Sequence, residues 1–243
     1  MPIVTTRAVV LQTYRYSDTS KILRLLTLDH GPQSAIARGA LRPRSRMSGL
    51  LEPFAEGMAT LYLKPNRDLH ALSGFDLIRE RQALGVDLPR FTGASLLCEL
   101  VLRIAPREAD PVLFEVLVTA LDDLLAADGP DVQPVVVASV WHLMAVLGFA
   151  PSVEVCVECG REPEPGRPAR FDLGEGGLRC HRCSAAGRIL PPDEVAALRA
   201  LVAGRTGAGA SAAQLGLLSE FIRYHAAEGS RIRSLEFLGA VLP

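Results

Sequence analysis

The chain has 243 residues and a mass of 26.1 kDa, which allows one large domain or two small ones. Hydrophobic residues make up 49% and charged residues 22% of the sequence, and this balance excludes an intrinsically disordered chain. The apolar runs are expected to be shorter than the roughly 18 residues that cross a bilayer. The N-terminus has no apolar stretch typical of a signal peptide, so we expect a cytoplasmic protein.

The net charge of −1 conceals an uneven distribution. Residues 1–81 contain 12 lysines and arginines against 7 acidic residues, whereas residues 82–243 contain 14 against 20. A basic part joined to an acidic part indicates two domains with different partners. Lys21 and Lys64 are the only lysines, and arginine favours two-pronged contacts to phosphate and stacking on bases. The arginine total alone also fits the codon bias of a GC-rich genome.

The first 80 residues predict five β-strands. Short runs of β-branched and apolar residues are separated by turn residues such as Asp29–Pro32, where glycine tolerates a positive φ and proline removes a ladder donor. The second and third runs are expected to pair as a hairpin. Five short strands with a longer connection after the third favour an OB-fold barrel over residues 1–80. The predicted strands are Val4–Leu11, Lys21–Leu28, Gln33–Leu41, Phe54–Leu63 and Leu69–Ile78, with a turn at Pro65–Asp68.

From about residue 81 the hydrophobic pattern becomes helical, so residues 81–243 are expected to form a helical domain and the protein to be α+β. Asp110 precedes a proline in the first helical turn, and Ser211 with Gln214 makes a capping box. Leu215, Leu218, Ile222 and His225 fall on one helical face. The predicted helices are Phe91–Ile104, Asp110–Ala127, Val132–Phe149, Pro191–Val202 and Ser211–Ala227, the last stopping at Gly229, with a linker over residues 203–210.

Four cysteines lie in an insert over residues 151–188, as two Cys-x-x-Cys pairs separated by 20 residues: Cys156, Cys159, Cys180 and Cys183. Two such pairs can bring four thiolates into a tetrahedron, the geometry that zinc prefers. The prediction is one structural zinc ion, with a redox pair, a disulfide or another metal as alternatives. His181 could replace one cysteine but is expected to face solvent, and Cys98 is expected in a helical core.

A basic loop follows the third predicted strand. Four arginines lie within nine residues, with no acidic residue before Glu52. Positive loops beside an OB-fold sheet follow a phosphate backbone, while aromatic side chains stack on bases. A solvated loop and tyrosines that merely pack on the barrel are the alternatives. The candidate DNA contacts are Arg38, Arg42, Arg44, Arg46, Arg7, Arg15, Lys64 and Arg67, and the candidate stacking residues are Tyr14, Tyr16 and Tyr62.

No catalytic motif is found. Neither lysine follows a glycine, so a phosphate-binding loop of the Gly-Lys-Ser/Thr type is excluded. The zinc-protease and serine-hydrolase motifs are missing too. Asp122 and Asp123 are neighbours on a helix and point in different directions, which makes them a poor metal pair for a nuclease. A protein without enzymatic activity is therefore expected.

The chain resembles the RecO family of bacterial recombination mediators. The N-terminal part of the resemblance consists of Tyr16–Leu23, Leu26–Thr27, Gly31, Ala37–Ala40, Ser45 and Leu51–Phe54. The four cysteines stand where zinc-bearing members keep theirs, and Arg231–Leu238 is similar to the family's C-terminal segment. The similarity extends over nearly the whole chain.

The resemblance implies a function in DNA repair and homologous recombination. Members bind single- and double-stranded DNA and anneal complementary strands without ATP or another nucleotide. With RecR, they help to load RecA on DNA covered by single-strand-binding protein. It also implies that the zinc is structural, that Arg38 contacts DNA and that the protein is associated with the nucleoid. The alternative is a zinc-ribbon assembly or transcription factor that bridges proteins and does not anneal DNA.

Overall fold

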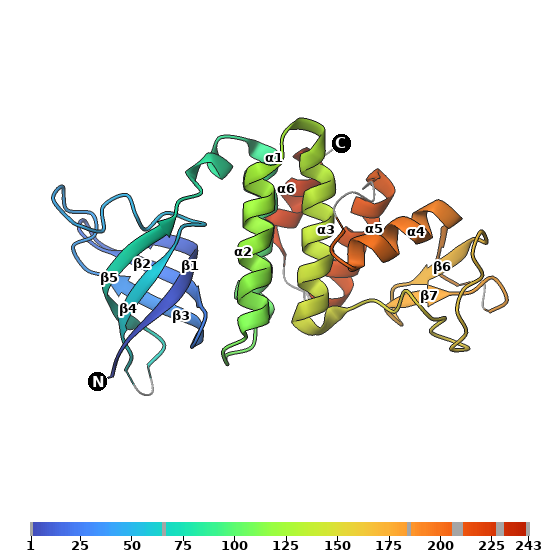
Figure 1. Ribbon diagram of the computed structural model, residues 1–243, viewed down its shortest axis with the longest axis horizontal. Coiled ribbons are helices and arrows are strands. Elements are labelled where there is room, and N and C mark those ends of the chain that lie inside the picture. Colours follow the sequence, from blue (N-terminus) through green and yellow to red (C-terminus); the bar gives the residue numbers. More distant parts are fainter. Residues whose placement is uncertain (1, 65–66, 184–185, 206–210, 227–230, 242–243) are drawn as a thin grey trace. The chain divides into compact units, whose positions relative to one another are not determined.

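The computed structural model describes residues 2–64, 67–183, 186–205, 211–226 and 231–241 (Figure 1). The chain divides into two compact units, Met1–Leu125 and Ala126–Pro243. Four features expected from the sequence lie wholly or partly outside the described residues: Pro65 and Asn66 of the predicted turn, residues 206–210 of the linker, the helix end at Ala227 and the stop at Gly229. The division of the chain at residue 80 stays a prediction.

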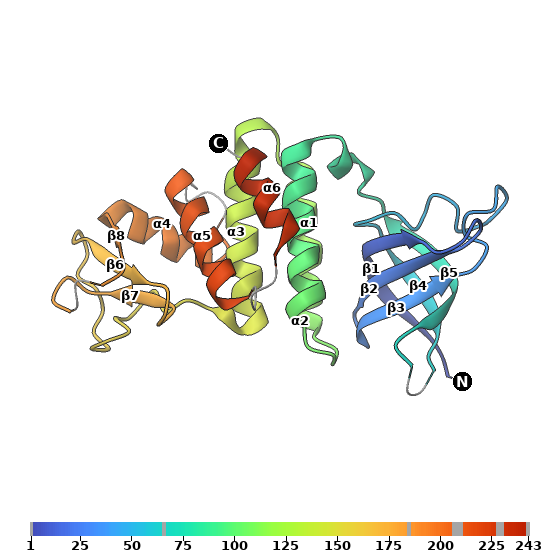
Figure 2. The same ribbon diagram turned by 180° about the vertical axis from the view of Figure 1, so that it is seen from behind.

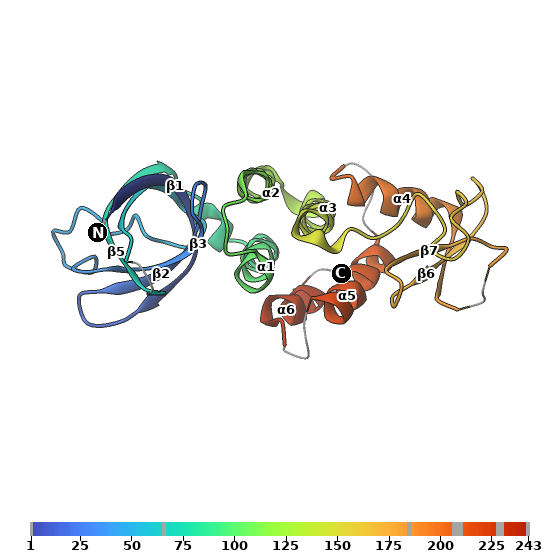
Figure 3. The same cartoon turned by 90° about the horizontal axis from the view of Figure 1, so that it is seen from below.

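Five strands of the first unit form a closed barrel with the order β1-β2-β3-β5-β4. They curve round a common interior (Figure 3). All neighbouring pairs are antiparallel except β3 and β5, which run parallel and close the barrel. The predicted OB-type barrel is thereby confirmed. The strands are β1 (Ile3–Arg15), β2 (Lys21–Thr27), β3 (Gly31–Ala37), β4 (Glu56–Tyr62) and β5 (His70–Arg79).

Two strand ends differ from the prediction by four residues, and the other ends by two residues or fewer. β1 continues to Arg15 because its pairing with β2 shifts register between Val10 and Gln12, and this bulge lets one long strand pair with β4 in its first half and with β2 in its second. β3 stops at Ala37, before Leu41, because Gly39 has a φ of +72° and turns the chain away from the sheet.

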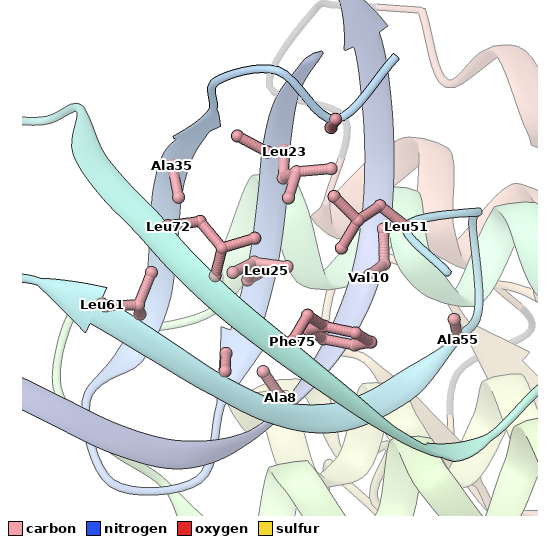
Figure 4. Close-up of a cluster of buried hydrophobic side chains, with 13 residues drawn as sticks. Ala8, Val10, Leu23, Leu25, Ala35, Leu51, Ala55, Leu61, Leu72 and Phe75 are labelled. Carbon is pink, nitrogen blue, oxygen red and sulfur yellow. The ribbon is translucent and has the colours of Figure 1, made fainter. Parts of the chain in front are cut away.

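Small and branched apolar side chains fill the barrel (Figure 4). They come from alternate positions on the strands, as the two-residue period of a half-buried sheet requires. Phe75 is the largest member of the cluster, and Leu51 and Ala55, from the connection between β3 and β4, also belong to it. This connection is therefore part of the barrel core.

Two helices complete the first unit. A short 3-10 helix, η1 (Gln82–Gly85), leads into α1 (Leu88–Ile104), and α2 (Pro111–Ala126) follows. The carboxylate of Asp87 accepts a hydrogen bond from the amide of Arg90 at the start of α1, and Asp110 accepts one from Leu113 at the start of α2. Both helices thus begin at a capping aspartate.

The second unit combines helices with a small sheet. η2 (Gly129–Asp131) leads into α3 (Val132–Met144) and a π-helical turn, η3 (Ala145–Phe149). A three-stranded antiparallel sheet, with the order β7-β6-β8, then precedes α4 (Figure 2). The remaining elements are β6 (Ala169–Asp172), β7 (Gly177–Arg179), β8 (Arg188–Leu190), α4 (Pro192–Val202), α5 (Ala212–His225) and α6 (Arg233–Val241).

The capping box predicted at α5 forms only in part. The Ser211 hydroxyl accepts a hydrogen bond from the amide of Gln214 at 3.2 Å, as expected. The Gln214 side chain instead reaches the carbonyl oxygen of Glu194 at 2.9 Å. A glutamine that bridges to α4 cannot also cap the start of its own helix, so tertiary packing overrides the local motif.

Aromatic rings connect the small sheet to the helices of the second unit. Phe221 of α5 lies edge-on to Phe171 of β6 at 6.0 Å between ring centroids, and 5.1 Å from Trp141 of α3. All three side chains are buried. The cysteine-rich insert is therefore packed against the helical core.

One segment in the described part of the chain, Gly129–Phe149, is long and apolar enough to cross a membrane by length and composition. The expectation that every apolar run is too short is therefore wrong. Half of the most apolar window in this segment is buried inside the structure. Core helices of globular proteins pass the same test, so this is weak evidence for a membrane span.

Candidate nucleic-acid interface and metal centre

The basic loop, defined here as residues 38–55 between β3 and β4, is a chain of tight turns. The amide of Arg42 donates to the carbonyl of Gly39 at 3.1 Å, the amide of Ser45 to Arg42 at 3.0 Å, and that of Ser48 to Ser45 at 3.1 Å. Buried apolar side chains fix the loop to the barrel between these turns. They are Ala40 and Leu51, with Met47 and Leu50 packed against the same core.

The basic loop carries four arginines that are open to solvent. The side chains of Arg38, Arg42, Arg44 and Arg46 are all exposed. None of the four forms an ion pair with any residue that the structure describes. Four guanidinium groups without counter-charge, on a backbone fixed by buried anchors, create a positive surface suited to phosphates.

The turn between β1 and β2 lies beside the basic loop. The amide of Leu41 donates to the carbonyl oxygen of Thr19 at 3.0 Å. In the same region Arg15 is exposed and pairs with Asp18 at 3.0 Å, an exposed contact that contributes little stability. Tyr14 and Tyr16 are 48% and 62% exposed, so both rings are open to solvent.

Two of the candidate basic residues, Lys64 and Arg67, lie away from the basic loop. Strand pairing places Arg15 at one end of β1 and Tyr62, two residues before Lys64, at the other. At roughly 3.3 Å per residue the two ends are on the order of 40 Å apart along the strand. Lys64 is half-buried and Arg67 exposed. The structure therefore brings Arg15 close to the basic loop but leaves Lys64 and Arg67 at the opposite end of the barrel.

Arg7 is held by acidic neighbours inside the first unit. Its Nη2 lies 2.7 Å from Glu56 Oε1 and its Nη1 lies 2.6 Å from Glu115 Oε1. Its guanidinium carbon also lies 5.1 Å from the centre of the Phe114 ring. The hydrogen bond to Glu56 is the main cause of a raised pKa for Arg7. Two carboxylates neutralise this cation, and nothing in the local sequence indicates either of them.

The four cysteines of the insert come together as a candidate metal centre. The sulfurs of Cys156, Cys159, Cys180 and Cys183 all lie within 4.8 Å of one another. Cys159 and Cys180 are separated by 3.8 Å and Cys180 and Cys183 by 3.5 Å. Four sulfurs at about 2.3 Å from a central zinc ion lie about 3.8 Å apart. The set therefore fits a tetrahedral metal ion.

Backbone amides favour the thiolate form of Cys156. Burial raises the pKa of the Cys156 thiol, but the amides of Cys180, Cys159 and Glu158 outweigh it and lower the pKa to about 6. The amide of Cys180 lies 3.3 Å from the Cys156 sulfur. At Cys183 the effect is opposite, because hydrogen bonding of its protonated thiol with the Cys180 and Cys159 sulfurs raises its pKa. Metal ligation requires thiolates, and the backbone amides favour this form at Cys156.

Two further side chains behave as the sequence predicts. The His181 side chain has an exposed fraction of 28%, and its Nε2 lies 3.8 Å from Glu164, so it does not belong to the cysteine cluster. Cys98 is buried in α1, and burial raises the pKa of its thiol to about 12. The four insert cysteines alone make up the centre among the described residues.

Comparison with known proteins agrees with this architecture. The chain matches the descriptions "Recombination protein O N terminal" over residues 1–81 and "Recombination protein O C terminal" over residues 85–235. A DNA repair protein RecO from Anaeromyxobacter sp. (strain K) is 33% identical, covering 97% of this chain and 95% of the relative. Those of a Nocardioides species and of Thermobifida fusca are 32% and 29% identical, covering 81% and 95% of this chain and 81% and 96% of theirs. The chain belongs to the RecO family of DNA repair proteins.

Proposed function

We propose that this protein is a recombination mediator that binds the backbone of single- and double-stranded DNA through the basic loop. The observation that supports this most directly is the group of four exposed arginines without a carboxylate partner in the described structure. Arg15 and the exposed rings of Tyr14 and Tyr16 extend the same surface. Arg7 has an internal role, because two carboxylates already bind it.

Annealing of complementary strands follows from backbone binding. Two like-charged strands repel each other, and arginines that neutralise phosphates release condensed cations and lower that repulsion. Contacts to phosphate leave the base edges free to pair. No nucleotide is consumed and no catalytic step is assigned to any residue. Lys64 and Arg67, at the other end of the barrel, are a second set of phosphate contacts.

The partners of this activity are proposed from the family. The protein acts with RecR, recognises single-strand-binding protein on coated DNA and helps to load RecA there, which places it at the nucleoid. An acidic second part, with 20 acidic against 14 basic residues over 82–243, is unsuited to DNA backbone and suits protein partners.

We assign a single zinc ion to Cys156, Cys159, Cys180 and Cys183. Four sulfur donors suit zinc, and a full set of protein ligands leaves no position for a reacting water, so the role is structural. The metal would hold together two short segments that have little hydrophobic core of their own.

The test is the annealing of two complementary labelled oligonucleotides without ATP at increasing salt. We expect fast annealing at low salt and a steep decline as salt rises. Arg42→Ala, Arg44→Ala and Arg46→Ala together should lower the salt slope of duplex DNA binding by about 2 to 3, at roughly 0.9 per phosphate contact. A matched control replaces three exposed arginines of the second unit, Arg167, Arg205 and Arg223. Equal effects of the two triple variants would contradict a specific role of the loop, and absence of annealing at any salt would favour a protein-bridging factor.

A further inference from the structure

A buried ion-pair network joins the barrel to helix α2 within the first unit. The Arg81 side chain has an exposed fraction of 0% and that of Glu56 4%. Arg81 Nη2 lies 3.0 Å from Glu56 Oε2, and Arg81 Nε lies 2.6 Å from Asp122 Oδ1. A guanidinium group removed from water needs acceptors for its N–H groups, and Arg81 has three, from two separate parts of the chain.

The third partner of Arg81 is the backbone of Phe54. Arg81 Nη1 donates to the Phe54 carbonyl oxygen at 3.0 Å. Phe54 is the one described residue other than glycine with a positive φ, at 71°. A side chain in this region strains the backbone, and such a residue persists only where its surroundings hold it. The Phe54 amide also donates to Val10 at 2.7 Å, and its ring meets Phe91 edge-on at 5.9 Å.

Phe54 lies where the basic loop returns to the barrel. It stands eight residues after Arg46 and two before β4. Just before it, Leu51 is buried in the barrel core, and Glu52 forms an ion pair with Lys21 at 2.8 Å. The orientation of the Phe54 peptide therefore sets the direction in which the basic loop enters β4.

We propose that Arg81 is a positioning residue for the basic loop. It clamps the strained Phe54 peptide to Glu56 and Asp122 and so fixes the loop that carries the exposed arginines. Because Arg81 is fully buried, it acts without touching DNA. The effect on DNA binding rests on the proposed function, whereas the effect on the loop does not.

The test compares Arg81→Lys with Arg79→Lys. Arg79 is half-exposed and binds the same carboxylate, Asp122, at 2.9 Å, but among the described contacts it has none with Phe54. Both changes keep the net charge, so long-range attraction of DNA is equal in the two variants. A lysine has a single ammonium group, which cannot bind all three partners that the planar guanidinium group of Arg81 binds.

In Arg81→Lys we expect the hydrogen-exchange rates of the amides of residues 38–50 to rise about tenfold, the factor that corresponds to the loss of one hydrogen bond. The exchange rates of the β2 amides should not change. Oligonucleotide affinity should fall by a similar factor with the salt slope kept, since the loop arginines remain. Arg79→Lys should stay within about twofold of the unchanged protein in both measurements.

Unchanged loop exchange in a folded Arg81→Lys protein would overturn the proposal, whatever happens to DNA binding. Raised exchange with unchanged affinity would support the positioning role and contradict the loop's role in DNA binding. If Arg81→Lys does not fold, Asp122→Asn keeps Arg81 and weakens one of its three contacts. A selective rise in loop exchange in that variant supports the proposal, and its absence overturns it.

Discussion

Gly31 packs directly against the backbone of Glu108, and a Cβ on residue 31 would lie 2.5 Å from the Glu108 carbonyl oxygen. Gly31 also has a φ of +64°. The turn between β2 and β3 thus fits against the connection between α1 and α2 only without a side chain. Sequence reasoning assigned Gly31 to a turn, but the close approach comes from a segment more than 70 residues away.

Gly31→Ala should therefore destabilise the first unit by more than a left-handed conformation alone, which costs about 1–2 kcal/mol. Gly49→Ala is the matched control, because Gly49 has a φ of +75° with nothing within 4 Å of a Cβ. Urea denaturation of both variants gives the comparison. Equal losses would show that the contact with Glu108 carries no cost.

Glu56→Ala should cost about 3–5 kcal/mol of unfolding free energy, because it leaves Arg81 buried with one carboxylate fewer. Glu52→Ala, which removes a 40% exposed carboxylate from Lys21, should cost about 1 kcal/mol or less. Chemical denaturation measures both values. A small loss for Glu56→Ala would mean that water readily replaces its carboxylate.

Cys159→Ser should lower the bound zinc below the one equivalent per chain that we expect for the unchanged protein. One thiolate of four is lost, and the remaining three hold the ion more weakly. Atomic emission on the purified protein measures the metal content. Cys98→Ala removes a buried cysteine outside the cluster and should keep the full equivalent; loss of zinc there would argue against the assignment.

Tyr14→Ala should weaken single-stranded DNA binding by about 1–3 kcal/mol if the exposed ring stacks on a base. The salt slope should not change, because no charge is removed. Tyr14→Phe keeps the aromatic face and should restore most of the affinity. Tyr224→Ala, which removes a more exposed ring of the second unit, serves as the control. Fluorescence anisotropy with a labelled oligonucleotide compares the three.

The stability of the first unit should decline as the pH falls below about 6.5. Burial is the main cause of a lowered pKa for His70, with Asp68 opposing it and Lys64 adding to it. The unfolded chain, with a pKa of 6.5, therefore takes up the proton more readily than the folded one, and stability is lost in acid. His70→Gln can still accept the Lys64 amide and should show a smaller loss between pH 7.5 and 5.5 in urea titrations. An unchanged loss would assign the effect to other groups.

Sequence patterns predicted the barrel because its strands obey a two-residue period and are separated by strong turn residues. They did not predict β6, β7 and β8, which have three or four residues each. Strands this short carry too little periodicity to detect, and packing around Phe171 and the cysteine cluster stabilises them. Helix α6 was missed as well, although Leu235 and Leu238 are buried.

The candidate sites divide in the same way. The arginine run and the cysteine pairs are local in sequence, so their clustering could be predicted. From sequence alone, Arg7 could not be distinguished from the exposed arginines, because its partners Glu56 and Glu115 lie 49 and 108 residues further along the chain. Nor does any local pattern mark Arg81, whose partners come from the basic loop, β4 and α2.

The aromatic contacts of the second unit have a practical consequence. Trp141 is the sole tryptophan of the chain, and it lies 5.1 Å from Phe221, which in turn contacts Phe171 of the small sheet. Indole fluorescence therefore reports the second unit and the packing of its cysteine-bearing insert, with no contribution from the barrel. When tryptophan fluorescence and the circular dichroism of the β-strands are followed in one sample, the two signals separate the unfolding of the two units. Substitutions at Gly31 or Glu56 should shift the midpoint of the circular dichroism signal and leave the midpoint of the fluorescence signal unchanged.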